Sequence, residues 1–68
     1  MIPVSSSNLA EVGYDSDKQI LYIRFHDGSL YAYHYVPSEV YRSLMCAPSK
    51  GKFLHQGIKG IYPYERLE

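Results

Sequence analysis

The segment of residues 19–35 constrains the fold of this chain more than any other part. Its two halves, residues 20–25 and 29–35, are rich in β-branched and aromatic side chains, and Asp27-Gly28 between them is typical of a tight turn between antiparallel strands. We therefore predict a β-hairpin. The length of its loop matters, because a slip of one residue moves every side chain of a strand to the opposite face of the sheet.

Two loop lengths are compatible with this hairpin. A two-residue loop would pair Phe25 with Leu30 and put the tyrosines of the second strand on the face opposite the apolar residues of the first. A three-residue loop with Gly28 left-handed in a G1 bulge would instead pair Phe25 with Ser29 and gather six large side chains on one face. We favour the bulge, because a chain of 68 residues needs one thick core rather than two thin ones.

The bulged register divides the hairpin into two faces. The inner face would carry Leu21, Ile23, Phe25, Tyr31, Tyr33 and Tyr35. The outer face would carry Ile20, Tyr22, Arg24, Leu30, Ala32 and His34.

Aromatic side chains have to supply much of the core. Cys46 is the only cysteine, so the chain can form neither an internal disulfide nor a metal site from cysteine pairs. Eight of the ten aromatic residues are tyrosine, whose hydroxyl needs a partner or water. We expect many of these rings to be half-buried.

The flanking segments complete an α+β pattern. Apolar residues alternate over residues 10–14 as in a strand with one solvent-exposed face, and residues 15–18 are typical of a turn. Val36-Pro37-Ser38-Glu39 is typical of a helix start, and Pro48 ends the apolar spacing that follows. Ser49 can cap a second, shorter helix, and residues 60–64 suit an edge strand or docked arm because Pro63 excludes a central strand.

We predict a single α+β domain over residues 8–66. Its expected parts are a three-stranded antiparallel meander, one main helix packed on one face, a short second helix and an extended C-terminal arm. Residues 1–7 are expected to form a flexible lead-in. Leu67 and Glu68 are given no weight, because a terminal Leu-Glu pair is also what a cloning remnant leaves.

The charge and the hydropathy of the sequence limit the classes of partner that the protein can bind. The formal net charge is zero, but residues 1–41 hold two bases and five acids, whereas residues 42–68 hold five bases and two acids. Neutrality argues against strong nonspecific binding of nucleic acid, while the basic second part suggests a surface that faces a polyanion. No apolar stretch is long enough for a membrane helix and none resembles a signal peptide, so we expect no membrane association and a cytoplasmic location.

No catalytic group, cofactor or metal site is predicted. His26, His34 and His55 lack the close spacing of zinc ligands, and Asp15-Ser16-Asp17 lacks the glycine and glutamate of a calcium loop. Cys46 has Arg42 one helical turn away but no base or oxyanion donor that could make it a nucleophile. We therefore expect a protein that is not an enzyme.

The remaining candidate is a basic and aromatic surface. On the outer face of the sheet, Tyr22, Arg24 and His34 would form a platform of the kind on which single-stranded bases stack. Phosphate contacts would come from Arg42, Lys50, Lys52 and Lys59. The alternative is that this face packs against other parts of the chain or a second copy, with the cations simply solvated.

The chain resembles the KTSC domain over nearly its whole length. The resemblance is carried by Gly13-Tyr14-Asp15, the apolar alternation from Leu21 to Gly28, Tyr31-x-Tyr33, the Val36-Pro37 helix start and Ser49-x-Gly51. That family is named after a C-terminal extension of lysyl-tRNA synthetase and also occurs as a small stand-alone protein. The resemblance implies RNA binding by association with a tRNA-charging enzyme, and it brings no catalytic residues.

Two functions follow as hypotheses. The first is a cytoplasmic, non-enzymatic module that binds RNA or another single-stranded nucleic acid through the seven residues named above. The second is a protein-interaction or homodimerisation module in which Ile20, Tyr22 and Leu30 meet a partner surface.

Overall fold

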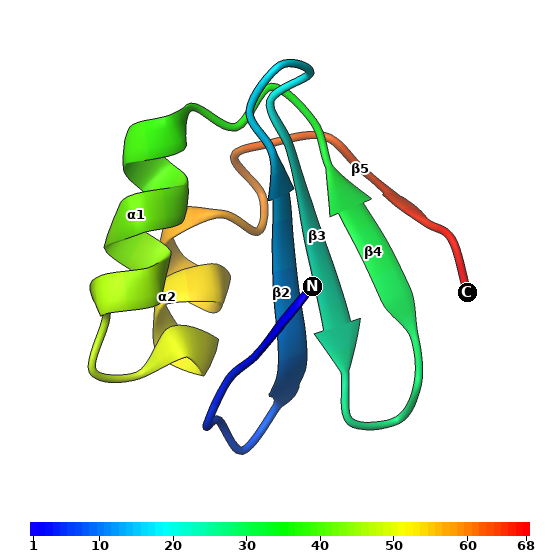
Figure 1. The fold of residues 1–68 in the computed structure, drawn as a ribbon, viewed down its shortest axis with the longest axis vertical. Coiled ribbons are helices and arrows are strands. Elements are labelled where there is room, and N and C mark those ends of the chain that lie inside the picture. The colour runs from blue at the N-terminus through cyan, green and yellow to red at the C-terminus, as the bar shows by residue number, and fades with distance from the viewer.

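The computed structural model describes residues 1–68 as two helices packed on one face of a five-stranded antiparallel sheet (Figure 1). The strands follow one another in chain order across the sheet, β1-β2-β3-β4-β5. The elements are β1 (Ile2–Pro3), β2 (Leu9–Asp15), β3 (Ile20–Phe25), β4 (Leu30–Tyr33), α1 (Ser38–Cys46), α2 (Lys50–Gly57) and β5 (Tyr64–Arg66).

The central hairpin adopts the bulged register. Leu21 lies opposite Tyr33 and Ile23 opposite Tyr31, while the amide of Phe25 donates to the carbonyl of Ser29 at 2.9 Å. Gly28 has a φ of +93° and its amide donates back to Phe25 at 3.0 Å. The predicted pairing is therefore confirmed, and with it the assignment of the two faces of β3 and β4.

The sheet has two more strands than the three we predicted. Ile2–Pro3 lies in the segment expected to be a flexible lead-in, yet it pairs with Val12 and Glu11 of β2. At the other edge, Tyr64–Arg66 extends the expected C-terminal arm into a strand that pairs with Tyr31–Tyr33. Both additions are short strands at an edge, where few apolar residues are needed and the sequence pattern is correspondingly weak.

Tyr35 lies outside the core, contrary to the alternation predicted for residues 29–35. Its φ of +62° turns the chain after His34, so that Tyr35 is 73% exposed and the next residue, Val36, is completely buried instead. The amide of Val36 donates to the carbonyl of Gln19 at 2.9 Å, and the hydroxyl of Tyr14 donates to the carbonyl of Val36 at 2.6 Å. These two contacts fix the turn that leads into α1.

The helices begin and end close to the predicted residues. Pro37 precedes α1, and Ala47 follows it immediately before Pro48. The hydroxyl of Ser49 accepts a hydrogen bond from the amide of Lys52 at 3.3 Å, which confirms Ser49 as the N-cap of α2. Both helices are short, and packing of their apolar faces has to hold them in place.

One core joins the helices to the inner face of the sheet. Leu44 of α1, Leu54 of α2 and Ile58 beyond α2 are buried against apolar residues of the sheet. The core consists of Leu9, Val12, Leu21, Ile23, Tyr33, Val36, Leu44, Leu54 and Ile58. Both helices lie at the β2 side, so that β4 and β5 extend beyond them (Figure 1). The inner face of these last two strands is left without a helical cover.

Candidate nucleic-acid interface

An open groove of about 730 Å³ lies where the helices leave the inner face of the sheet uncovered. We call it the aromatic groove. Its aromatic lining is Phe25, Tyr31, Tyr33 and Tyr64. The remaining lining residues are Ser7, Asn8, His26, Asp27, Ser29, Lys59 and Gly60. Its volume falls in the range of small-molecule and cofactor sites.

The aromatic rings of the groove pack around Tyr31. Tyr31 stands edge-on to Phe25, with ring centroids 5.4 Å apart and planes at 87°. On its other side Tyr31 stacks with Tyr64 at 5.7 Å and with Tyr33 at 6.4 Å. Tyr33 is 1% exposed and forms the floor, whereas Tyr64 is 60% exposed and forms an outer wall. The groove thus presents accessible ring surface on a buried support.

Two cations border these rings. The Nζ of Lys59 lies 5.8 Å from the ring centroid of Phe25, and the guanidinium carbon of Arg66 lies 5.9 Å from that of Tyr31. Both distances are within the range of a cation–π contact. Lys59 follows α2 and lines the groove, and Arg66 belongs to β5 and borders the groove over Tyr31.

The groove ends in polar residues at the β3–β4 turn. Asp27 Oδ1 accepts hydrogen bonds from the Ser29 amide at 2.9 Å and the Ser29 hydroxyl at 2.6 Å. The bond from the Ser29 hydroxyl is the main reason that the pKa of Asp27 lies below its ordinary value. The bond from the Ser29 amide and the charge of Arg66 lower this pKa further. Asp27 is therefore an ionised acceptor in a fixed orientation.

Burial raises the pKa of Tyr33 to about 12, with smaller contributions from its neighbours Tyr31 and Tyr64. A phenol loses its proton less readily where its anion would be poorly solvated. Tyr33 accordingly keeps its hydroxyl proton throughout the neutral range.

The structure places three of the predicted site residues on the opposite, outer face. Tyr22, Arg24 and His34 lie there together, as the confirmed register requires. Arg24 pairs with Glu68 at 2.7 Å, which raises the pKa of Arg24, and His34 lies 3.1 Å from a carboxylate oxygen of Glu65. Arg24 and His34 thus each have a carboxylate as a neighbour on this face.

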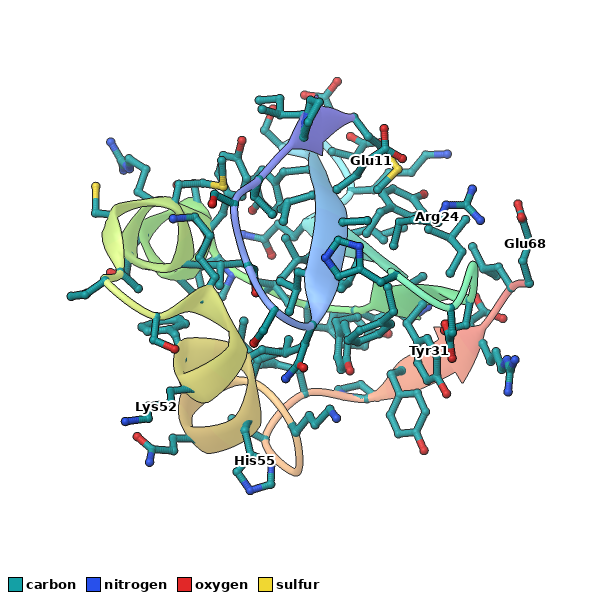
Figure 2. All side chains as sticks on the ribbon, turned by 90° about the horizontal axis from the view of Figure 1, so that it is seen from below. Glu11, Arg24, Tyr31, Lys52, His55 and Glu68 are labelled. Atoms are coloured by element: carbon teal, nitrogen blue, oxygen red, sulfur yellow. The ribbon has the colours of Figure 1, made fainter.

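The four predicted phosphate contacts do not converge beside Tyr22. Arg42 belongs to α1, and Lys50 and Lys52 belong to α2, on the other side of the sheet. Lys52 lies on that side and Arg24 away from it (Figure 2). Lys59 is the one residue of the predicted site that reaches the aromatic groove. The expected single surface of seven residues is therefore divided among three regions of the molecule.

Sequence reasoning missed the groove because it treated the inner tyrosines as covered core. Tyr31 and Tyr33 were placed on the correct face, but the main helix was expected to pack over that face. Both helices lie at the β2 side of the sheet, and this position leaves β4 and β5 without a helical cover (Figure 1). No local sequence pattern marks the strands against which a helix packs, so the sequence carried no signal for this groove.

The structure contains neither a metal-ligand cluster nor a membrane-spanning helix. No group of three or more His, Cys, Asp or Glu side chains is arranged to hold a metal ion. Neither helix has the length and apolar character needed to span a membrane.

These features define a small α+β domain with a five-stranded meander, two helices at one end of its inner face and an aromatic groove at the other. The sequence model of the KTSC domain matches residues 5–62, so the chain belongs to the KTSC domain family. The crystal structure of a KTSC domain protein from Yersinia pestis has the same fold, with a TM-score of 0.91 and 39% identity over 97% of this chain and 93% of that one.

Relatives of this chain are of two lengths. A protein of Tsukamurella paurometabola is 44% identical over 59 residues, which are 87% of this chain and 88% of that protein. A lysine–tRNA ligase of Trichormus variabilis is 40% identical over 67 residues, which are 98% of this chain but 12% of the ligase. The domain is thus similar both to small proteins and to one part of a much longer enzyme.

Proposed function

We propose that the chain is a non-enzymatic module of the cytoplasm that binds single-stranded RNA in its aromatic groove. The observation that carries this proposal is the presence of accessible, mutually packed tyrosine rings beside two cations. Proteins that bind single strands combine aromatic side chains, on which bases stack, with positive charge that follows the phosphates.

Each part of the groove has a role in this proposal. Tyr31 and Tyr64 offer ring surface to bases, and Tyr33 supports them from below. Lys59 and Arg66 contact phosphates on either side. The similarity to part of a lysine–tRNA ligase supports RNA as the ligand, because the name of that relative states that it acts on tRNA.

The aromatic groove replaces the outer face in our proposal. The charge of Arg24 is paired with Glu68, and Glu11 lies directly opposite Arg24 in the sheet. Carboxylates next to a platform repel the phosphates of a strand that would stack on it. The inner groove is lined by one carboxylate, Asp27, and one cation, Lys59, and Arg66 adds a second cation at its border, which makes it the better surface for a polyanion.

Fluorescence anisotropy with a labelled single-stranded RNA at low salt tests the proposal. We expect Tyr64→Ala, Lys59→Ala and Arg66→Ala each to weaken binding several-fold, since a stacked base is worth about 1–3 kcal/mol and a phosphate contact contributes through counterion release. The matched controls are Lys52→Ala on α2 and Tyr22→Ala on the outer face, which should bind as the wild type does. Absence of binding at low salt, or equal losses in the controls, would reject the aromatic groove.

The second hypothesis, a protein-interaction or homodimerisation module, uses the outer face. It is favoured by one observation, that both helices lie on the other side of the sheet and leave Ile20, Tyr22 and Leu30 without a helical cover. Sedimentation at two protein concentrations tests the homodimer. A monomer at both concentrations would exclude it.

A further inference from the structure

The polar end of the aromatic groove carries a group that can distinguish one base from another. Asp27 is the only carboxylate among the residues that line the groove. It lies in the turn that joins β3 to β4, one residue before Gly28, and the rings of Phe25 and Tyr31 lie on the two strands that this turn connects. A base stacked on these rings would therefore have its edge near an ionised acceptor.

The hydrogen bonds of Asp27 leave it one free oxygen. A carboxylate oxygen has two lone pairs, and both lone pairs of Oδ1 are engaged by the amide and the hydroxyl of Ser29. No hydrogen bond within the chain engages Oδ2. Ser29 is only 6% exposed, so the two bonds also fix the carboxylate in place. Asp27 can thus accept one further hydrogen bond, from a donor that enters the groove.

The chemistry of the bases determines which of them fits such an acceptor. Cytosine presents an exocyclic N4 amine, a donor that Asp and Glu commonly accept in nucleic-acid recognition. Uracil has a carbonyl oxygen at the same position, and two oxygens facing each other repel. With Oδ1 already occupied, the carboxylate cannot use both of its oxygens on the two adjacent donors of guanine. A base with a single amine is the better match.

We propose that the aromatic groove selects an amino-bearing base, cytosine in preference to uracil, through a hydrogen bond from the exocyclic amine to Asp27. This inference rests on the proposed RNA binding and adds a sequence preference to it. Stacking on Tyr31 and Tyr64 supplies affinity for either pyrimidine, because every base has an aromatic face, and Asp27 supplies the difference between them.

The test compares two RNA octamers, oligo(C) and oligo(U), by anisotropy under the same low-salt conditions. The two pyrimidines are similar in size, so the ratio of their affinities isolates the hydrogen-bonding edge. We expect oligo(C) to bind about tenfold more tightly, at the lower end of what one base contact provides. In Asp27→Asn, which keeps the shape and an oxygen for Ser29 but can donate to uracil, the ratio should fall to about one.

Two controls make the outcomes distinct. Asp17→Asn makes the same change of charge at the exposed β2–β3 turn, at the opposite end of β3, and should leave the ratio unchanged. An oligo(C) with two methyl groups on each N4 removes the amine protons without changing the protein, and it should bind the wild type no better than oligo(U). This probe also decides the question if Asp27→Asn does not fold.

Each outcome has one meaning. If neither octamer binds, the proposed RNA binding fails and this inference fails with it. Equal binding of both octamers would reject base selection while leaving RNA binding intact. A preference for oligo(C) that persists in Asp27→Asn or with the methylated octamer would overturn the role of Asp27.

Discussion

Gly28 illustrates how one residue sets the two faces of the sheet. Its φ of +93° is a backbone conformation that L side chains rarely adopt, and it closes the bulged turn that puts Tyr31 and Tyr33 on the inner face. A Cβ added at this position would meet no atom within 4 Å. Any cost of a substitution therefore comes from the backbone alone, which makes the position a direct measure of strain.

We predict that Gly28→Ala lowers the free energy of unfolding by about 1–2 kcal/mol, because alanine in a left-handed conformation is strained. Gly57→Ala is the matched control. Gly57 ends α2, and its added Cβ would lie at an ordinary 3.6 Å from the ring of Phe53, so alanine should stabilise the helix by up to about 1 kcal/mol. Urea denaturation measures both changes. A neutral or stabilising Gly28→Ala would contradict the bulged turn.

The buried phenol of Tyr33 predicts a loss of stability in alkali. Its folded pKa is about 12, against about 10 in the unfolded chain, so between these values the unfolded state releases a proton that the folded state retains. The neutral phenol makes its full contribution to the free energy of unfolding below pH 10. As the pH rises toward 12, this free energy falls by on the order of 2 kcal/mol. Tyr33→Phe has no proton to lose, and its unfolding free energy should fall less over this range. Equal pH dependence in both proteins would contradict the assignment.

At the scale of elements, the sequence predicted those with strong local signals. Asp27-Gly28 marked the hairpin and Ser49 marked the start of α2, whereas the register of the hairpin was chosen because a short chain needs one thick core. The edge strands β1 and β5 had no such signal, because a two- or three-residue strand is defined by its partner rather than by its own pattern. The turn at Tyr35 was also missed, since the contacts that hold it come from Gln19 and Tyr14, far away in the sequence.

The cap of α2 gives a prediction for a single element. Ser49→Ala removes the oxygen that accepts from the Lys52 amide, and α2 has only eight residues over which to spread the loss. We expect the free energy of unfolding to fall by about 1 kcal/mol. Ser49→Asp keeps an acceptor and places negative charge at the positive end of the helix, so it should retain wild-type stability or exceed it. Denaturant unfolding of the two variants is the measurement, and an equal loss in both would show that the hydrogen-bond acceptor is not the source of the loss.

At the scale of the whole molecule, the position of the helices and the pairing of β5 explain why the candidate site could be predicted only in part. The helices lie at the β2 side of the five-stranded sheet (Figure 1). Three of the four rings that line the groove belong to β4 and β5. The sequence placed Tyr31 and Tyr33 on the inner face and singled out Lys59. It could not bring Tyr64 and Arg66 to the same groove, because that depends on β5 pairing with β4.

The distribution of charge over the whole molecule predicts how binding responds to salt. The chain has a net charge of zero, and of its seven basic residues only Lys59 and Arg66 lie over the rings of the groove. For a single strand, the logarithm of the binding constant falls with the logarithm of the salt concentration with a slope of about −0.7 per phosphate contacted. Two contacts therefore give a slope of about −1.4, and Lys59→Ala should halve it. Titrations of a labelled RNA at four salt concentrations measure the slope. A value near −3 would instead require the cations of α1 and α2 to contact the strand, which the aromatic groove does not allow.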